Sequence, residues 1–155
     1  MSGALSHSAA DVIRHLLIDL GLGTLPTDAG SWPIYATITP ETPDSAITIT
    51  DTESLYEGRD HTSGEVQEHH GIQIAVRDAN HVDGYVKMDA IKIAIDQTVR
   101  NDSVPVPDAS GTGSTTYVVH CISRKSGILV AGKGATGSKR HLFTINAVAA
   151  LRQTS

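Results

Sequence analysis

The residues best suited to chemistry lie in a glycine-rich stretch, GILVAGKG, from Gly127 to Gly134. A phosphate-binding P-loop has the form GxxxxGK[ST], in which backbone N–H groups cradle phosphates and the last hydroxyl holds Mg²⁺. Here a glycine replaces that Ser or Thr. The loop interior, Ile128 to Ala131, has the pattern of a strand, whereas a P-loop leads directly into a helix N-terminus. We therefore interpret the stretch as the glycine-rich end of a β-hairpin.

The eight histidines are the next candidates, because His61, His69 and His70 share one polar segment. Adjacent His69 and His70 would point to opposite faces of a strand, and neither a cysteine partner nor an HExxH pair accompanies them. We therefore expect a solvated histidine-rich segment that binds no metal, and a protein without a cofactor.

Nucleophilic catalysis has no support in the sequence. There is no G-x-S-x-G elbow, and the single cysteine, Cys121, lies within a predicted strand between Val119 and Ile122. A cysteine in that setting is expected to be buried and inert. No two aspartates are spaced so that the sequence alone would bring them together. The sequence therefore predicts a protein that is not an enzyme.

The clearest local pattern spans residues 71–99 and predicts a strand followed by a helix. Apolar residues alternate from Ile72 to Arg77, which is typical of a strand. Asp78, Asn80 and Asp83 then offer side-chain oxygens that can cap a helix start. Two adjoining apolar stripes follow at helical spacing: Tyr85, Met88, Ile91, Ile95 and Val99, and beside them Val82, Val86, Ala90 and Ile93. We expect this wide face to be buried against the sheet.

An N-terminal helix and five further strands complete the expected elements. Ser6 or Ser8 can cap the helix, and Gly21 and Gly23 end it. Its apolar face consists of Val12, Ile13, Leu16, Leu17 and Leu20. Alternating patterns predict strands at residues 32–39, 46–51, 115–123, 128–131 and 139–151. The first two flank turn residues 40–44 and suggest a hairpin, while alanines at the end of the last strand leave a short helix as an alternative.

These elements predict an α+β fold in which a mostly antiparallel sheet of about five or six strands packs against two helices. We expect one domain, residues 1–155, with flexible loops at about 52–70, 101–114 and 132–138. The first of these segments is either a long loop or an extended hairpin. The second has the composition of a linker, with two prolines and two glycines, and we expect it to hold no core residues.

Composition excludes several function classes. With 12 Lys and Arg against 17 Asp and Glu, the net charge is -5, which disfavours a domain that binds by neutralising phosphates. Aromatic residues make up only 4% of the chain, too few for base-stacking platforms. A single cysteine fits a reducing compartment. The sequence has neither a secretory leader nor the roughly 18-residue apolar run of a membrane span, so we expect a soluble protein.

The sequence resembles the small tail terminator, or tail completion, proteins of long-tailed bacteriophages, which are sometimes labelled minor capsid proteins. The resemblance runs in the same order through most of the chain. It is carried by WPIY at 32–35 with TP at 39–40, PDSAITITD at 43–51, IQIAVRD at 72–78 before a helix with Tyr85, and KRHLFTIN at 139–146. The family's Gly-Arg before its last strand appears here as Lys139-Arg140, which keeps the cation and loses the glycine.

This resemblance implies a structural virion protein at the neck of the phage, assembled in the host cytoplasm. Such proteins form a homo-oligomeric ring, typically a hexamer, that binds the last ring of tail tube protein, stops its polymerisation and presents a surface to the head-tail connector or stopper protein. Genome DNA passes through the ring without specific binding, and the acidic balance of this chain suits that role. The expected functional residues are therefore interface residues.

We predict that these interface residues come from the resembling motifs and from the polar segment 52–70. The segment would act as an arm between subunits, with Leu55 and Tyr56 as anchors in a groove of the neighbour. The predicted interface residues are Trp32, Tyr35, Leu55, Tyr56, Arg59, Arg77, Lys139, Arg140 and Asn146. Two alternatives remain, a head-tail adaptor or stopper from the same neck region, and a small metal- or ligand-binding protein.

Overall fold

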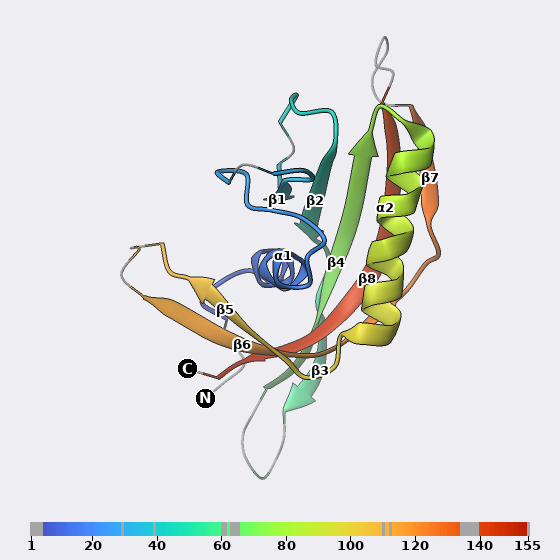
Figure 1. The fold of residues 1–155 in the computed structure, drawn as a ribbon. Helices are drawn as coiled ribbons and strands as arrows, with labels where there is room; N and C mark the ends of the chain where they lie inside the picture. The colour runs from blue at the N-terminus through green and yellow to red at the C-terminus, as the bar shows by residue number, and fades with distance from the viewer. Residues whose placement is uncertain are drawn as a thin grey trace.

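The computed structural model of the chain describes residues 5–28, 30–38, 40–59, 62, 66–109, 111, 113–133 and 140–154. These residues form a curled sheet with two helices on its inner face (Figure 1). The helices are α1 (Ala9–Asp19) and α2 (His81–Ile93), and α2 continues into a π-helical turn, η1 (Ala94–Thr98). The strands are β1 (Ile34–Ala36), β2 (Ala46–Asp51), β3 (Leu55–Arg59), β4 (Val66–Asp78), β5 (Asp102–Pro107), β6 (Ser114–Arg124), β7 (Leu129–Lys133) and β8 (His141–Gln153).

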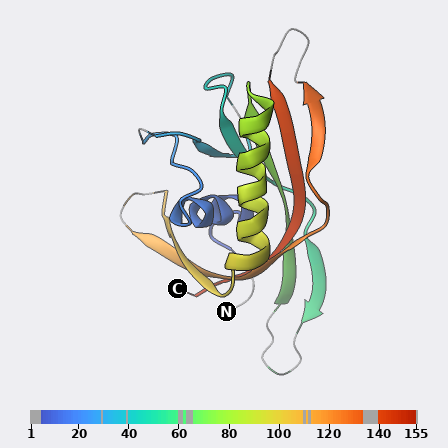
Figure 2. The same ribbon diagram turned by 45° about the vertical axis from the view of Figure 1, so that its right-hand side comes forward.

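The sheet is built on two long central strands. Its order is β1-β2-β4-β8-β6-β5, with β3 paired to β4 and β7 paired to β8. Both β4 and β8 have 13 residues, and they pair from His70 with Ala149 to Asp78 with His141. Figure 2 shows α2 lying along these strands while β5 and β6 curl beneath α1. The α+β fold and the strand predicted at residues 139–151 are confirmed.

The first two strands do not form the predicted hairpin. β1 runs parallel to β2, with Ile34 beside Ile47 and Ala36 beside Ile49. Alternation and turn-forming residues cannot distinguish a tight reversal from a connection that returns the chain to the starting end. The strand also ends early, because Thr37 adopts a φ of 77° and Ile38 turns into solvent.

The stretch predicted to be a linker at 101–114 contains a core strand. β5 pairs with β6, and Val104 and Val106 are fully buried. The alternation Val-Pro-Val-Pro places both valines inward and both prolines outward. Because β5 is the last strand of the sheet, a proline there interrupts no ladder. Proline content therefore indicated an edge strand, and the prediction of a coreless loop was wrong.

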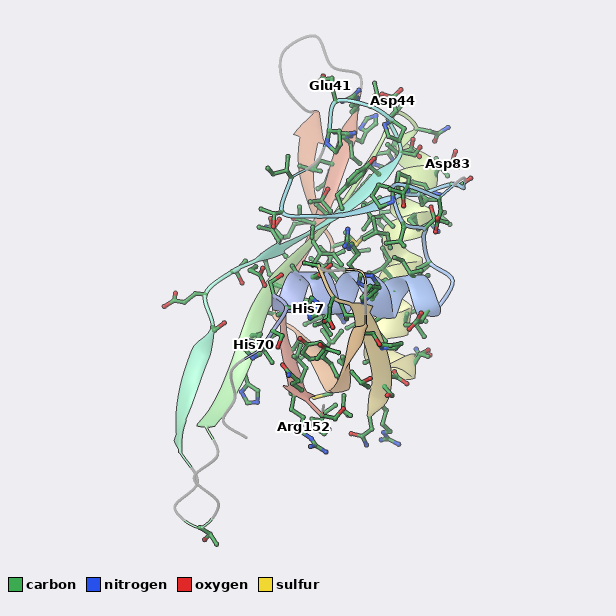
Figure 3. All side chains as sticks on the ribbon, turned by 90° about the vertical axis from the view of Figure 1, so that its left-hand side faces the viewer. His7, Glu41, Asp44, His70, Asp83 and Arg152 are labelled. Atoms are coloured by element: carbon green, nitrogen blue, oxygen red, sulfur yellow. The ribbon has the colours of Figure 1, made fainter. Side chains whose placement is uncertain are left out.

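The segment 52–70 folds as the hairpin alternative. β3 pairs with the first part of β4, and this hairpin extends away from the helices (Figures 1 and 3). Between β2 and β3 the chain lies directly over Gly71, because a Cβ added there would be 2.3 Å from Thr52 Oγ1 and 2.4 Å from the Glu53 carbonyl oxygen. Of the third predicted loop, 132–138, the first two residues end β7 and residues 134–138 lie outside the described part of the chain.

The first helix follows the sequence signals closely. Ser8 caps it by accepting a hydrogen bond from the Asp11 N–H, and Asp11 lies in the first turn, where the helix dipole favours an anion. At the other end Gly21, with φ of 78°, allows the Leu22 N–H to bond the Leu17 carbonyl. The helix therefore begins and ends where local chemistry permits, with its apolar face in the core.

We expect replacement of this cap to weaken the fold measurably. Ser8→Ala removes the acceptor for the Asp11 amide and should lower the free energy of unfolding by about 1 kcal/mol, or a melting temperature shift of about 2–4 °C. Thermal unfolding followed by circular dichroism measures this. Ser8→Asp supplies another acceptor and should unfold close to the wild-type temperature; equal losses in both variants would contradict the capping role.

Cys121 is exposed, contrary to the prediction of a buried thiol. The pairing of β6 with β8 shifts by one residue between Val119 and Cys121, which marks a β-bulge. The shift turns both Val119 and Ile122 into the core and leaves Cys121 on the outer face. Simple alternation cannot anticipate an inserted residue.

Candidate assembly interface

One side of α2 carries exposed apolar residues that no described part of the protomer covers. Met88 and Ile91 of the first stripe are buried against the sheet, as predicted, whereas Tyr85 of the same stripe is exposed. On the opposite side, Val82, Val86 and Ile93 are 65%, 61% and 44% exposed, and we call these three residues the α2 ridge. The prediction that both stripes are buried in the sheet was wrong, because a sheet covers only one side of a helix.

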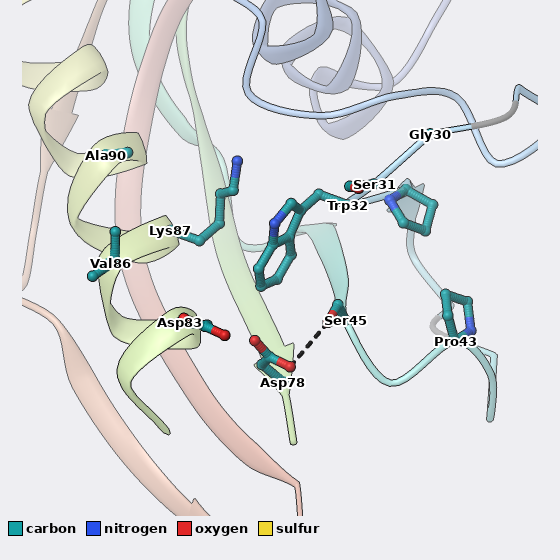
Figure 4. A pocket seen from close by; sticks show the side chains of 11 residues that line it. Gly30, Ser31, Trp32, Pro43, Ser45, Asp78, Asp83, Val86, Lys87 and Ala90 are labelled. Atoms are coloured by element: carbon teal, nitrogen blue, oxygen red, sulfur yellow. Dashed lines mark hydrogen bonds between the residues drawn. The ribbon is translucent and has the colours of Figure 1, made fainter. Parts of the chain in front are cut away.

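A groove of about 510 Å³ separates α2 from the loops before β1 and β2 (Figure 4). We call it the Trp32 groove. Apolar groups form much of its wall and two carboxylates lie at one end. Its lining residues are Gly30, Ser31, Trp32, Pro33, Pro43, Ser45, Asp78, Asp83, Val86, Lys87 and Ala90. Because Val86 belongs to both features, the groove and the α2 ridge form one continuous surface.

Trp32 is held in an unusual backbone conformation at this groove. Its φ of 63° lies in the left-handed region, which costs a bulky residue about 1–2 kcal/mol. The Thr24 N–H donates to its carbonyl at 3.1 Å and the Lys87 Nζ lies 5.3 Å from its ring centroid. The ammonium also donates to the Leu22 carbonyl, and burial lowers the pKa of Lys87. Lys87 therefore contacts both the Trp32 indole and Leu22, which follows the C-terminus of α1.

Asp78 is the most buried charged group of the groove. It is 6% exposed, and the Ser45 hydroxyl donates to its Oδ1 at 2.9 Å. Within the described part of the chain, no Lys or Arg makes an ion pair with it. Asp83, in the first turn of α2, is exposed beside it (Figure 4). A carboxylate taken out of water without a cation is unfavourable, so this end of the groove favours a cationic group.

A second apolar surface lies on the other side of α2. Leu129 and Val130 of β7 are both exposed, and Val130 pairs with Phe143, whose ring meets Tyr85 of α2 at a 6.0 Å centroid distance. Val130 therefore faces the same side of the sheet as α2, and Leu129, its neighbour in the strand, faces the outer side. Among the described strands β7 pairs only with β8, so its other backbone edge forms a border of the sheet.

Two predicted interface residues, Arg77 and Arg140, bind within the protomer. Arg77 Nη2 donates to the Pro43 carbonyl at 2.5 Å, and Arg140 Nε donates to Asp44 Oδ1 at 2.8 Å. Arg140 Nη2 also donates to the Glu41 carbonyl. Burial lowers the pKa of Arg77, and the nearby Arg140 lowers it further. The two guanidinium groups clamp the connection between β1 and β2; contact with another subunit stays a prediction for both.

The other predicted interface residues are scattered. Trp32 lines the groove, and Tyr35 of β1 pairs with Thr48 of β2. On the outer face of the sheet, Asn146 Oδ1 accepts a hydrogen bond from Gln73 Nε2 at 3.1 Å. Leu55, Tyr56 and Arg59 lie on β3, with side chains outside the described part of the structure, and Lys139 lies outside it altogether. The sequence reasoning thus named Trp32, whose contact with another subunit stays a prediction, and did not name Asp78, Val82, Val86 or Ile93.

The histidines and the glycine-rich stretch are the sequence's other candidates for chemistry. Among the described residues no group of three or more His, Cys, Asp or Glu could hold a metal ion; His61 lies outside them. His81 and His141 meet edge to face at 5.2 Å. Ile128 to Ala131 leads into β7, and most of it is strand, as expected. No helix of the described residues has the length and apolar character to cross a bilayer.

Comparison with known proteins identifies the group to which these features belong. A family model described as bacteriophage tail terminator protein matches residues 16–106, which is more than half of the chain. The chain belongs to this family. None of the curated proteins that were compared matches it. The tail terminator is therefore a structural protein of a bacteriophage tail, as the resemblance indicated.

The matched region of this tail terminator contains the surface described above. Residues 16–106 include Trp32, Asp78 and the whole of α2. A signal for the α2 ridge is present in the sequence: an amphipathic helix with more apolar face than one sheet can cover implies a second partner. Asp78 had no comparable signal, since its burial depends on loops distant in sequence.

Proposed function

We propose that this tail terminator forms a ring that binds the end of the tail tube, stops tube polymerisation and joins the tail to the head connector. Family membership supports the tail role, and the α2 ridge is the observation that supports assembly. Three large apolar side chains on the outward side of a rigid helix are unfavourable in water and mark a protein contact. A homohexamer is the ring size that the family resemblance implies.

The proposed ring acts by shape and by shared surfaces. DNA passes through it without specific contacts, because the chain has a net charge of -5 and lacks a phosphate-neutralising excess of cations. The partners are further copies of the chain, the tail tube protein and the head-tail connector or stopper protein. The β3–β4 hairpin serves as the arm between subunits, with Leu55 and Tyr56 as its anchors.

Two measurements test this function. Native mass spectrometry and light scattering of the purified chain should find a closed oligomer. Added to polymerising tail tube protein, the chain should shorten the tubes and cap one end in electron micrographs. A monomer at all concentrations, or tubes of unchanged length, would contradict the proposal. Binding to the portal side of the neck without an effect on tubes would instead indicate an adaptor or stopper.

A further inference from the structure

Charge is strongly segregated along the chain. All 17 Asp and Glu residues lie at or before Asp108, whereas six of the 12 Lys and Arg residues follow it. The carboxylate-free part contains β6, β7 and β8, and the acidic part contains α2 and both loops of the Trp32 groove. The two parts of the chain therefore present surfaces of opposite sign.

Lysines flank the apolar residues of β7. Lys125 precedes the strand in an exposed turn, and Lys133 ends it. We call Lys125, Leu129, Val130 and Lys133 the β7 edge. Both exposed apolar residues of this edge thus lie between two cations, without any carboxylate in that stretch of sequence.

The surface with the opposite character is the α2 ridge with the Trp32 groove. It combines exposed Val82 and Val86 with the carboxylates of Asp78 and Asp83. Of the seven large apolar residues that are exposed in the described part of the chain, four belong to α2 and two to β7. The two surfaces are therefore matched in apolar character and opposite in charge.

We propose that the β7 edge of one copy of this chain docks on the α2 ridge and Trp32 groove of the next copy. The proposal rests on the ring of the proposed function and identifies the contact that builds it. The valines of α2 meet Val130 and the backbone border of β7, and the lysines of the β7 edge lie opposite the acidic end of the groove. The positive charge of the β7 edge then lies opposite the carboxylates of Asp78 and Asp83.

This contact is head-to-tail, because the two surfaces differ and lie on opposite sides of α2 (Figure 1). An open assembly has a free β7 edge at one end and a free groove at the other. Copies therefore add in one direction until the rotation between neighbours closes a ring. Lys133 pairs with His141, whose ring contacts His81 of the first turn of α2, where Asp83 also lies. Lys133 and Asp83 therefore lie at the same end of α2.

Charge reversal and mixing test the contact. Asp83→Lys and Lys133→Glu should each raise the protomer concentration at half-assembly by about tenfold at low salt. Mixed in equal amounts, the two variants alternate around the ring and every contact again joins a lysine to a carboxylate. The mixture should therefore assemble within about threefold of the wild-type concentration. Light scattering over a dilution series measures these midpoints, and circular dichroism verifies that each variant is folded.

Matched reversals elsewhere provide the control. Asp28→Lys lies in a turn outside the groove lining, and Arg152→Glu lies toward the far end of the molecule from Asp83 (Figure 3). Neither should change the midpoint by more than about twofold, alone or mixed, since single exposed charges contribute little. If the wild type forms rings but the mixture of Asp83→Lys and Lys133→Glu does not, the docking contact is overturned and the proposed function stands. A wild type that never assembles would overturn both.

Trp32 provides a second readout that needs no substitution. It is the only tryptophan of the chain and lines the groove. Acrylamide quenching of its fluorescence should fall at least twofold when wild-type protomers assemble, and should stay high in Lys133→Glu at the same concentration. Equal quenching in rings and in monomers would show that the groove stays open to solvent and would overturn the contact.

Discussion

Gly71→Ala is expected to lower the melting temperature by about 5–10 °C, which corresponds to about 2–3 kcal/mol for a chain of this size. The added methyl group would meet Thr52 Oγ1 and the Glu53 carbonyl oxygen, which lie over the backbone of β4 at that point. The hydroxyl can rotate away, but the carbonyl belongs to the chain that crosses the strand. Relief therefore requires the β2–β3 connection to move as a unit.

Two further variants make this expectation specific. Thr52→Ala combined with Gly71→Ala removes the side-chain clash and leaves the carbonyl, so it should recover little of the lost stability. Gly127→Ala, where nothing lies within 4 Å of the added methyl group, should unfold close to wild type. Thermal and urea unfolding measure all three. Full recovery in the double variant would show that the crossing chain is easily displaced.

Val86→Glu should abolish assembly without harming the protomer. Val86 lies on the α2 ridge and lines the Trp32 groove, so a glutamate there adds a third carboxylate to Asp78 and Asp83 and removes an apolar contact. A charge left unpaired in an interface should raise the protomer concentration at half-assembly by about 100-fold or more. The protomer should melt within about 4 °C of the wild type, because the helix preference of glutamate at an exposed position offsets its repulsion from Asp83. Light scattering and thermal unfolding measure the two effects.

The control for Val86→Glu adds the same charge elsewhere. Ser103→Glu lies on the exposed side of β5, outside the α2 ridge, the Trp32 groove and the β7 edge. It should assemble like the wild type. If both variants lose the ring, general charge repulsion is responsible; if neither does, the α2 ridge is not an assembly surface.

Local signals in the sequence predicted the elements well. Ser8, Gly21 and Asn80 act through neighbours two to five residues away, so both helix starts and the end of α1 were accessible without a structure. The alternation in β4 and β8 likewise reflects one buried face. These features depend on the order of residues along a short stretch.

Features that depend on distant parts of the chain were not accessible. The parallel pairing of β1 with β2 depends on a connection clamped by Arg77 and Arg140, and the register of Cys121 depends on a bulge. For the candidate site, Trp32 was predicted from a motif, whereas the buried carboxylate of Asp78 is created by packing against Ser45 and the start of α2. The periodicity of apolar residues also indicates which faces of a helix are apolar, but it does not indicate which element or which other protein covers each face.

The prolines of β5 affect how readily copies of the chain can pair through the border of the sheet. Pro105 and Pro107 have no N–H to offer along the outer border of the sheet. An extended border with free amides is a template on which like chains add indefinitely as fibrils. Because two prolines occupy this border, it offers fewer amides to a second chain, and we expect concentrated subunits to add to one another there less readily.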